Sequence, residues 1–264
     1  MFFVLQKEIR KNMDIDVYAF MQVLEKHRYM HEYTYMSLDE MKSTAGFLGS
    51  DKAVPVGTIE FVQAYLKQIH GIKKMNPIEI PEVLRKPEYL HREYRIIKAS
   101  ELPKDGNWFI KDGSRLKGFS YAGNIQNAGI TYDNDTGMDD YFKIHVKEDQ
   151  TIVLSSLINI RSEYRAIVIN NEIKAVQYYD GDCLAMLSQE QAERLKQMVH
   201  MYSWSEECPR AYTMDIAITK ENVLAVIECH PFVSVGLYGY YADDLPYAYR
   251  NGLDWYLECN KELY

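Results

Sequence analysis

A charged segment at residues 109–119, Phe-Ile-Lys-Asp-Gly-Ser-Arg-Leu-Lys-Gly-Phe, carries residue types that can hold a phosphate group. Lys111 and Lys117 bracket the small and polar stretch 112–115. Small residues let the backbone approach a ligand closely, and lysine side chains neutralise phosphate charge. A solvated, charged hairpin tip has the same composition, so the segment alone leaves both interpretations open.

Lys111 also allows a second chemistry, covalent nucleotidyl transfer, in which the lysine itself becomes adenylated. DNA ligases, RNA ligases and capping enzymes carry such a lysine in the pattern Lys-x-Asp-Gly. Here Lys111, Asp112 and Gly113 are consecutive, and the chain contains neither Glu-Gly-x-Val-x-Lys nor a late Lys-x-Lys. This chemistry remains one alternative, and a non-catalytic nucleotide-binding protein is another.

Three candidate metal ligands, Asp215, Glu228 and His230, lie near the C-terminus. Side chains two residues apart on a strand point to the same face, which groups Glu228 with His230. A hairpin about residues 219–222 would place Asp215 across from Glu228. Two carboxylates suit Mg²⁺, which shares its shell with phosphates and water. A turn-capping carboxylate and a structural histidine at a sheet edge would explain the same residues.

Two arginines, Arg161 and Arg165, open another predicted hairpin, whose tight turn is Asn170-Asn171. Because they are four residues apart on an extended strand, we expect them to share a face. Arginine recognises phosphate with two parallel hydrogen bonds. A pair of surface arginines with Glu163 as a local partner is the other interpretation.

The order of these features along the chain resembles that of the ATP-grasp superfamily. The order is a strand-end lysine, a glycine-containing loop, a β-rich run, paired arginines, a helix and an acidic hairpin. Enzymes of this superfamily hold ATP between two α+β subdomains. Their strand-end lysine contacts phosphate and corresponds to Lys111, in the stretch 109–112. Their phosphate-contacting arginine corresponds to Arg165, in the stretch 163–168.

Two more parts of the family pattern have counterparts. The family's metal ligands are an aspartate and, about a dozen residues later, Glu-x-Asn. Asp215 and Glu228 match these, and His230 stands where asparagine is usual. The family's connecting strand offers backbone hydrogen bonds to adenine, and the best match is Leu154, Ser155, Ser156 and Leu157.

The stretch 228–239 resembles, more narrowly, the phage and bacterial clade named for two arginines and a lysine, and this resemblance covers about residues 90–264. It implies an ATP- and Mg²⁺-dependent ligase that activates a carboxylate as an acyl phosphate and joins it to an amine or similar nucleophile. The sequence does not identify the carboxylate substrate or the amine substrate. Peptides and proteins are among the candidates.

The resemblance also implies a role for each candidate. Lys111 and Lys117 would bind the α- and β-phosphates, and Arg165 with Arg161 would stabilise the transferring phosphoryl group. One or two Mg²⁺ would be held by Asp215 and Glu228, assisted by His230. No protein nucleophile is required for this chemistry.

The elements that would position these residues follow from apolar patterning and capping residues. Residues 2–6 and 33–38 predict strands, and 151–160 a long β-rich run. Further signals mark where helices begin: Asp14, Thr58, Ser188 with Gln191 three residues on, and Asp244. Together with the two hairpins, these elements predict an α+β domain with an antiparallel sheet.

A proline-punctuated stretch, residues 76–81, predicts a boundary, because residues before proline disfavour helix. We expect a small α/β region resembling the pre-ATP-grasp part of the family over residues 1–85. The ATP-grasp domain would follow over 86–264, with a smaller subdomain at 86–155 and a larger one at 156–264.

Composition excludes several classes of protein. The chain has 264 residues and a net charge of −8, which argues against a protein that coats nucleic acid. No apolar run reaches the length of a membrane span, and the first residues lack the basic region of a signal peptide. The four cysteines form no Cys-x-x-Cys pair. We expect a cytoplasmic protein, bacterial or phage-encoded, and the sequence does not indicate its oligomeric state.

Overall fold

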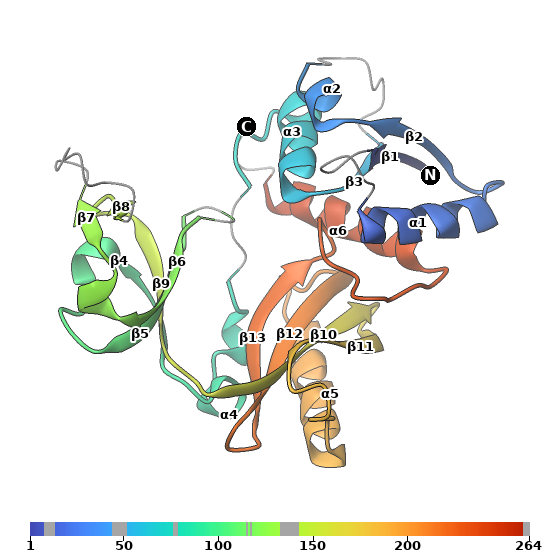
Figure 1. Ribbon diagram of the computed structural model, residues 1–264. Helices are drawn as coiled ribbons and strands as arrows, with labels where there is room; N and C mark the ends of the chain where they lie inside the picture. The colour runs from blue at the N-terminus through green and yellow to red at the C-terminus, as the bar shows by residue number, and fades with distance from the viewer. Residues whose placement is uncertain are drawn as a thin grey trace.

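The computed structural model describes residues 1–7, 14–43, 52–75, 79–114, 116, 118–132 and 143–260. Within these ranges three sheets of three or four strands, with helices against them, form a mixed α+β structure (Figure 1). The predicted fold class is therefore confirmed. No helix in the described ranges is both long and apolar enough to cross a membrane.

The N-terminal region is a parallel sheet with strand order β2-β1-β3. Its strands are β1 (Phe2–Gln6), β2 (Glu32–Met36) and β3 (Val54–Val56), and its helices are α1 (Ile15–Lys26), α2 (Leu38–Ser43) and α3 (Ile59–His70). The predicted caps are confirmed, since the side chains of Asp14 and Thr58 accept backbone N–H groups of α1 and α3. The predicted strand at 33–38 ends earlier, at Met36, because α2 begins at Leu38.

Two short helical turns, η1 (Glu82–Leu84) and α4 (Pro87–Leu90), lead into the second sheet. This antiparallel sheet has the order β4-β9-β5-β6 and packs one face on a small core of its own. Its strands are β4 (Tyr94–Lys98), β5 (Asn107–Asp112), β6 (Ser120–Asn124) and β9 (Thr151–Ser156). Smaller elements complete this part: η2 (Ala99–Glu101), η3 (Ile125–Asn127), β7 (Ile130–Tyr132) and β8 (Ile144–Val146).

The third sheet is antiparallel with the order β11-β10-β12-β13. It comprises β10 (Ile160–Ile169), β11 (Glu172–Gly181), β12 (Ala211–Thr219) and β13 (Leu224–Pro231). Both predicted hairpins are confirmed, and Asn170 and Asn171 adopt positive φ of 52° and 64°, as a tight hairpin turn requires. The predicted β-rich run at 151–160 is divided, because β9 ends at Ser156 and β10 begins at Ile160.

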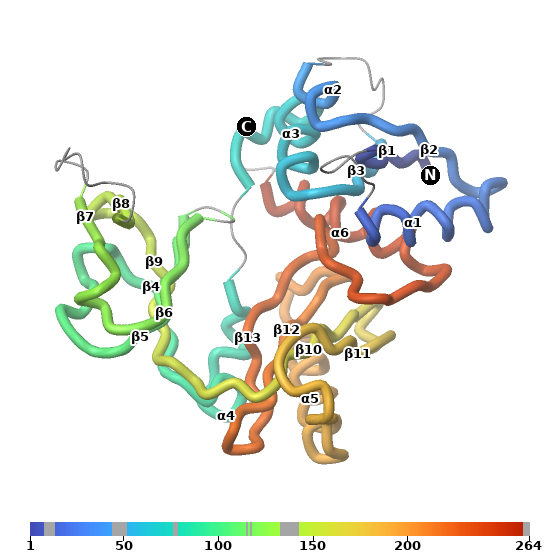
Figure 2. The backbone as a smooth tube through the Cα atoms, viewed as in Figure 1, coloured from blue at the N-terminus to red at the C-terminus, as the bar shows by residue number. Residues whose placement is uncertain are grey.

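One helix covers each face of the third sheet. Helix α5 (Gln189–Ser203) begins at the predicted capping box of Ser188 and Gln191 and packs on one face. Helix α6 (Leu245–Cys259) packs on the other face, in a core that also contains the N-terminal sheet and its helices. The backbone tube shows α6 between these two parts (Figure 2). The division at residue 85 stays a prediction, since α6 ties residues from both sides of it into one core.

Candidate active site

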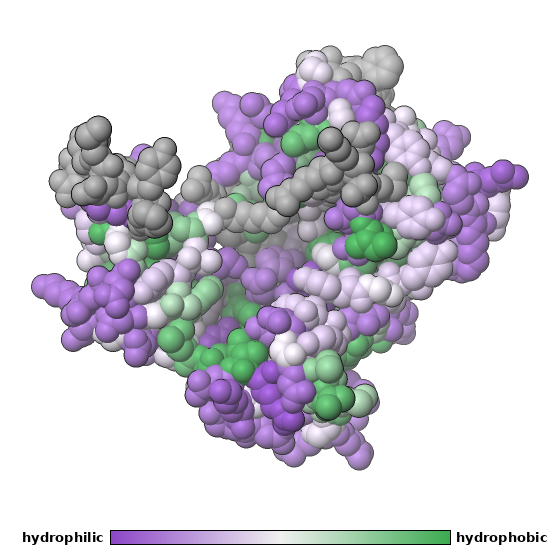
Figure 3. All heavy atoms as spheres, viewed as in Figure 1, coloured by the Kyte–Doolittle hydropathy of each residue, from purple (hydrophilic) through white to green (hydrophobic). Residues whose placement is uncertain are grey.

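A cavity of about 310 Å³ lies between the second and third sheets. The space-filling view shows the molecule hollowed between these sheets (Figure 3). Apolar side chains form a large part of the lining, and its charged residues are Glu79, Arg92, Lys111, Asp112, Glu163 and Glu228. The residues that line it are Glu79, Ile80, Arg92, Tyr94, Phe109, Lys111, Asp112, Gly113, Ala122, Val153, Ser155, Ser156, Leu157, Ile158, Ile160, Glu163, Ile227 and Glu228.

The predicted adenine-contacting segment reaches this cavity only in part. Ser155, Ser156 and Leu157 line it, whereas Leu154 is buried in the core of the second sheet. Leu157 and Ile158 lie beyond the last paired residue of β9, so the ladder does not use their backbone groups. This connection therefore presents an apolar surface together with backbone donors and acceptors.

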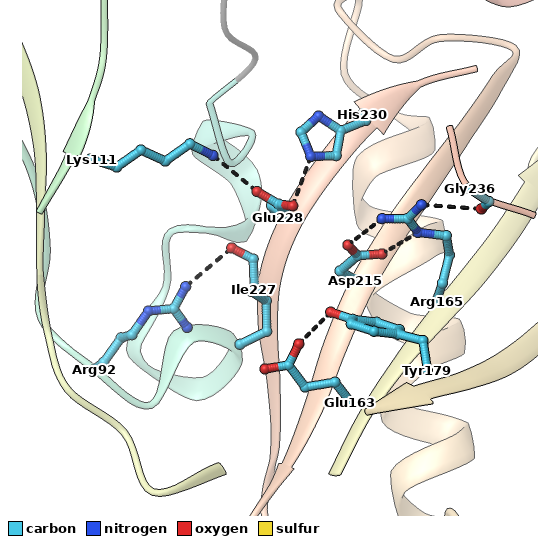
Figure 4. Close-up of polar contacts among 10 residues, drawn as sticks. All are labelled: Arg92, Lys111, Glu163, Arg165, Tyr179, Asp215, Ile227, Glu228, His230 and Gly236. Carbon is cyan, nitrogen blue, oxygen red and sulfur yellow. Dashed lines mark hydrogen bonds and ion pairs between the residues drawn. The ribbon is translucent and has the colours of Figure 1, made fainter. Parts of the chain in front are cut away.

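The charged end of the cavity joins the two sheets. Lys111 Nζ, at the end of β5, lies 2.9 Å from Glu228 Oε2 on β13, and His230 Nε2 lies 2.9 Å from Glu228 Oε1 (Figure 4). Burial alone would raise the pKa of Glu228, but the hydrogen bonds and charges of His230 and Lys111 outweigh it and hold the pKa below its usual value. Glu228 is therefore an anion held between two basic groups.

Arg165 and Asp215 form a second ion pair on adjacent strands. The guanidinium donates from Nε and Nη2 to the two carboxylate oxygens at 2.7 Å, and from Nη1 to the carbonyl of Gly236 at 3.1 Å (Figure 4). The rings of Tyr179 and Tyr238 stack on each other and lie near the guanidinium. As predicted, the hairpin places Asp215 across from Glu228.

Two of the predicted residues, Arg161 and Leu154, lie elsewhere than expected. A bulge between Ile160 and Ser162 interrupts the alternation of β10, so Arg161 is exposed and pairs with Asp182 at 2.9 Å. The structure thus separates Arg161 from Arg165, contrary to the expectation that they share a face. Lys117 lies outside the described residues. Leu154 faces the core, as noted above.

The neighbouring Asp112 is a buried acidic residue at the start of the loop. Its side chain is 1% exposed, and Oδ1 accepts both the N–H and the hydroxyl of Ser114 at 2.8 and 2.7 Å. A Cβ on Gly118 would overlap the Asp112 side chain, so a larger residue there would displace it. Asp112 therefore stabilises the start of the loop through buried hydrogen bonds to Ser114.

Glu163 is a cavity residue that the sequence interpretation treated only as a local partner for arginines. Burial raises the pKa of its carboxyl, and the charges of Asp180, Asp215 and Glu228 raise it further, whereas a hydrogen bond from Tyr179 opposes these effects. Glu163 therefore adds an acidic group to the cavity wall. In the sequence, the position of Glu163 within the Glu-x-Arg pattern was the feature that could have marked it as a site residue.

Arg92 is a cavity residue that sequence reasoning missed. Its guanidinium donates only to backbone carbonyls among the described residues: Leu90, Val226 and Ile227, at 3.1, 2.6 and 3.3 Å. Burial lowers its pKa to about 10, so it remains a cation at neutral pH. No sequence signal marked it, because its contacts join residues more than 130 positions apart.

The donor set can be tested against Mg²⁺. Among the described residues, no group of three or more His, Cys, Asp or Glu side chains gathers closely enough to hold a metal ion. Mg²⁺ needs fewer protein ligands, because it is commonly bound by one or two carboxylates together with substrate phosphates. Asp215 and Glu228, opposite each other on β12 and β13, fit that requirement.

A model of a known protein family matches part of this chain. Residues 89–248 match the model of an ATP-grasp domain, family 2 of the clade named for two arginines and a lysine. None of the curated proteins is similar enough in sequence to count as a match.

Solved structures show the same fold at low sequence identity. D-alanine–D-alanine ligase from Bacillus anthracis, complexed with ATP, is 12% identical, covers 99% of this chain and 97% of its own, and has a TM-score of 0.52. N5-carboxyaminoimidazole synthetase from Staphylococcus aureus is 12% identical, with coverage of 95% and 77% and a TM-score of 0.51. A RimK-domain ATP-grasp protein from Sphaerobacter thermophilus is 11% identical, with coverage of 97% and 100% and a TM-score of 0.50. The family model matches more than half of this chain. The chain therefore belongs to this two-arginine, one-lysine clade of the ATP-grasp superfamily.

Proposed function

We propose that this protein is an ATP- and Mg²⁺-dependent ligase that activates a carboxylate as an acyl phosphate and joins it to an amine or similar nucleophile. The observation that carries the proposal is the cavity between the second and third sheets. It combines an apolar slot with a charged end formed by Lys111 and Glu228. Small molecules and peptides are both candidates for the substrate pair.

In this proposal the nucleotide base occupies the apolar slot. Phe109, Val153 and Ile227 offer it apolar contacts, and the connection at Leu157 and Ile158 offers backbone hydrogen bonds. The phosphates then extend toward Lys111. Arg92, a half-buried cation in the same wall, adds positive charge for a polyanionic ligand.

The charged groups of the site form ion pairs with one another. Lys111 neutralises Glu228, and Arg165 neutralises Asp215, so each proposed phosphate ligand holds a proposed metal ligand. Mg²⁺ would neutralise phosphate charge in the transition state. With nucleotide and metal bound, Lys111 would turn toward phosphate oxygens, and Glu228 and Asp215 would hold the cation. Arg165 would keep its hydrogen bonds to Asp215 and direct its remaining N–H groups at phosphate.

The proposed reaction has two balanced steps. A carboxylate oxygen of the substrate attacks the γ-phosphorus of ATP, and ADP leaves with the electrons of the broken P–O bond. The amine nitrogen then attacks the acyl carbon, phosphate leaves, and the amine releases a proton to solvent. Arg165 stabilises charge on the transferring phosphoryl group with the N–H groups that Asp215 and Gly236 do not use.

Trapping with hydroxylamine tests this function. An acyl phosphate formed from a panel of amino acids, dicarboxylates and peptides would be captured as a hydroxamate, with one ADP released for each. We expect hydroxamate in the presence of both ATP and Mg²⁺ and none when either is omitted.

Intact-mass measurement after incubation with Mg²⁺ and ATP tests the alternative chemistry. We expect no mass gain, because the proposed reaction needs no covalent enzyme intermediate. A stable AMP adduct on Lys111 would replace the ligase proposal with nucleotidyl transfer.

A further inference from the structure

Strand β13 carries a bulge immediately before Glu228. Asp215 on β12 pairs with Glu228, whereas the next residue of β12, Ile216, pairs with Val226. Ile227 is therefore the extra residue that the bulge adds to β13. Because side chains of a strand alternate between its two faces, one extra residue reverses the face to which the following side chains point.

This reversal brings Glu228 and His230 to the candidate site. Leu224 and Val226, which precede the bulge, point into the apolar core under α5. Regular alternation from Val226 would direct Glu228 and His230 into the same core. Instead Cys229 points there and is 1% exposed, whereas Glu228 lines the cavity. The bulge therefore decides whether these two proposed metal ligands face the cavity.

Arg92 contacts the bulge at the open edge of the third sheet. Its Nη1 donates to the carbonyl of Val226 at 2.6 Å, and its Nη2 donates to the carbonyl of Ile227 at 3.3 Å (Figure 4). Successive carbonyl groups of a regular strand point to opposite edges. Because β13 is an edge strand and both carbonyls accept from one guanidinium, the bulge presents two successive carbonyls at this edge.

The guanidinium of Arg92 is itself held in place by the fold. Leu90, two residues earlier, is 3% exposed and belongs to the same core as Val226 and Cys229. The carbonyl of Leu90 accepts Arg92 Nη1 at 3.1 Å, which orients the guanidinium. Between them, His91 has a positive φ of 49°, a conformation that persists only where the surrounding structure fixes it. Arg92 therefore approaches the bulge from a fixed position.

We propose that Arg92 is a positioning residue for the metal site, which holds the bulge at Ile227 and so keeps Glu228 and His230 directed at the cavity. Its consequence for Mg²⁺ rests on the ligase function proposed above. This role depends on the planar fork of the guanidinium, which donates to two carbonyls at once. The positive charge that Arg92 offers a nucleotide does not depend on that shape.

The variant Arg92→Lys separates shape from charge, because lysine keeps the charge and lacks the fork. With ATP at saturation, calorimetry should show that the Kd for Mg²⁺ rises by about ten- to a hundredfold, as for other residues that orient metal ligands. Binding of ATP with EDTA should stay nearly unchanged. Arg95→Lys is the matched control, because Arg95 on β4 is exposed and pairs with Glu93; neither affinity should change.

The thiol of Cys229 gives a second measurement that needs no metal. In a background with Cys183→Ser, Cys208→Ser and Cys259→Ser, Cys229 is the only thiol of the chain. Release of the bulge lets regular alternation return and turns this thiol toward the cavity. We expect Arg92→Lys to increase the rate at which Cys229 reacts with dithionitrobenzoate by at least about tenfold, through local opening of β13. The control should react as slowly as the background does.

Different results would contradict the two parts of the inference. An unchanged Kd for Mg²⁺ in Arg92→Lys would show that Arg92 does not act through Glu228. A Cys229 thiol that stays unreactive, or that reacts only at the rate of global unfolding extrapolated from urea, would show that Arg92 does not hold the bulge. If wild type binds neither Mg²⁺ nor ATP, the proposed function fails, and the reaction of Cys229 still tests the hold on the bulge.

Discussion

At the residue scale, the candidate site balances its charges internally. Glu228 lies between Lys111 and His230, and Asp215 is held by both arms of the Arg165 guanidinium. These pairs differ in exposure, since Lys111 and Glu228 are about 30% exposed whereas Asp215 is 2% exposed. Substitution at Glu228 should therefore act mainly on function, and substitution at Arg165 also on stability.

Glu228→Gln should reduce ATP turnover by at least about a hundredfold, because it removes a negative charge proposed to hold the metal while hardly changing volume. The fold should survive, since the amide can still accept a hydrogen bond from Lys111. Turnover and circular dichroism check both statements. Glu190→Gln, an exposed change in α5, is the control; unaffected turnover in Glu228→Gln would remove Glu228 from the metal site.

Arg165→Met should destabilise the protein by about 3–5 kcal/mol, because it leaves Asp215 as a buried charge without its partner. The double variant with Asp215→Asn should recover part of this loss. Urea unfolding of the two single variants and the double variant measures the coupling. If the double variant loses as much stability as the two single variants added together, the pair contributes no coupling.

At the element scale, the sequence was most informative where the determinants are local. The caps at Asp14 and Ser188 and the turn at Asn170-Asn171 could be predicted because each depends on neighbouring residues. The hairpin of β12 and β13 followed from its turn, and it correctly placed Asp215 across from Glu228.

Other parts of the site depend on contacts that no local pattern records. The bulge that turns Arg161 toward Asp182 arises from the pairing of β10 with β12. The position of Arg92 depends on carbonyls of β13. Such contacts become visible only when the sheets are assembled.

Gly252→Ala in α6 should destabilise the protein by about 1–3 kcal/mol, because the new Cβ would overlap the carbonyl of Phe232 just after β13. In an open helix the same change would stabilise by up to ~1 kcal/mol. Thermal unfolding distinguishes the two signs. Asn251→Ala, at the preceding helical position, is the control and should be neutral or slightly stabilising; stabilisation by Gly252→Ala would contradict the close packing of α6.

At the scale of the whole molecule, the cavity is a junction between two sheets with separate cores. Lys111 and Glu228 join them at the charged end, and Arg92 joins them through carbonyls of β13. The N-terminal region meets the third sheet through α6 and the loop at 232–240. A ligand that replaces the direct ion pairs should therefore tie the two sheets together.

Mg²⁺ with ATP should stabilise the folded protein, by about 2.7 kcal/mol when the ligand is at a hundred times its dissociation constant. Hydrogen exchange should slow in β5 and in the connection at 155–158, which line the cavity. ATP with EDTA should stabilise less, because Glu228 and Asp215 then meet phosphate without a cation. An equal effect with and without the metal would contradict the proposed role of these carboxylates.

The most direct test of the central claim is ³¹P NMR of the products formed from ATP and Mg²⁺ in the presence of hydroxylamine and the full panel of amino acids, dicarboxylates and peptides. Transfer of the γ-phosphoryl group to a carboxylate predicts ADP and inorganic phosphate, formed in equal amounts with the hydroxamate. AMP and pyrophosphate, or no turnover of ATP at all, would contradict the assignment of this cavity to a carboxylate-activating ligase.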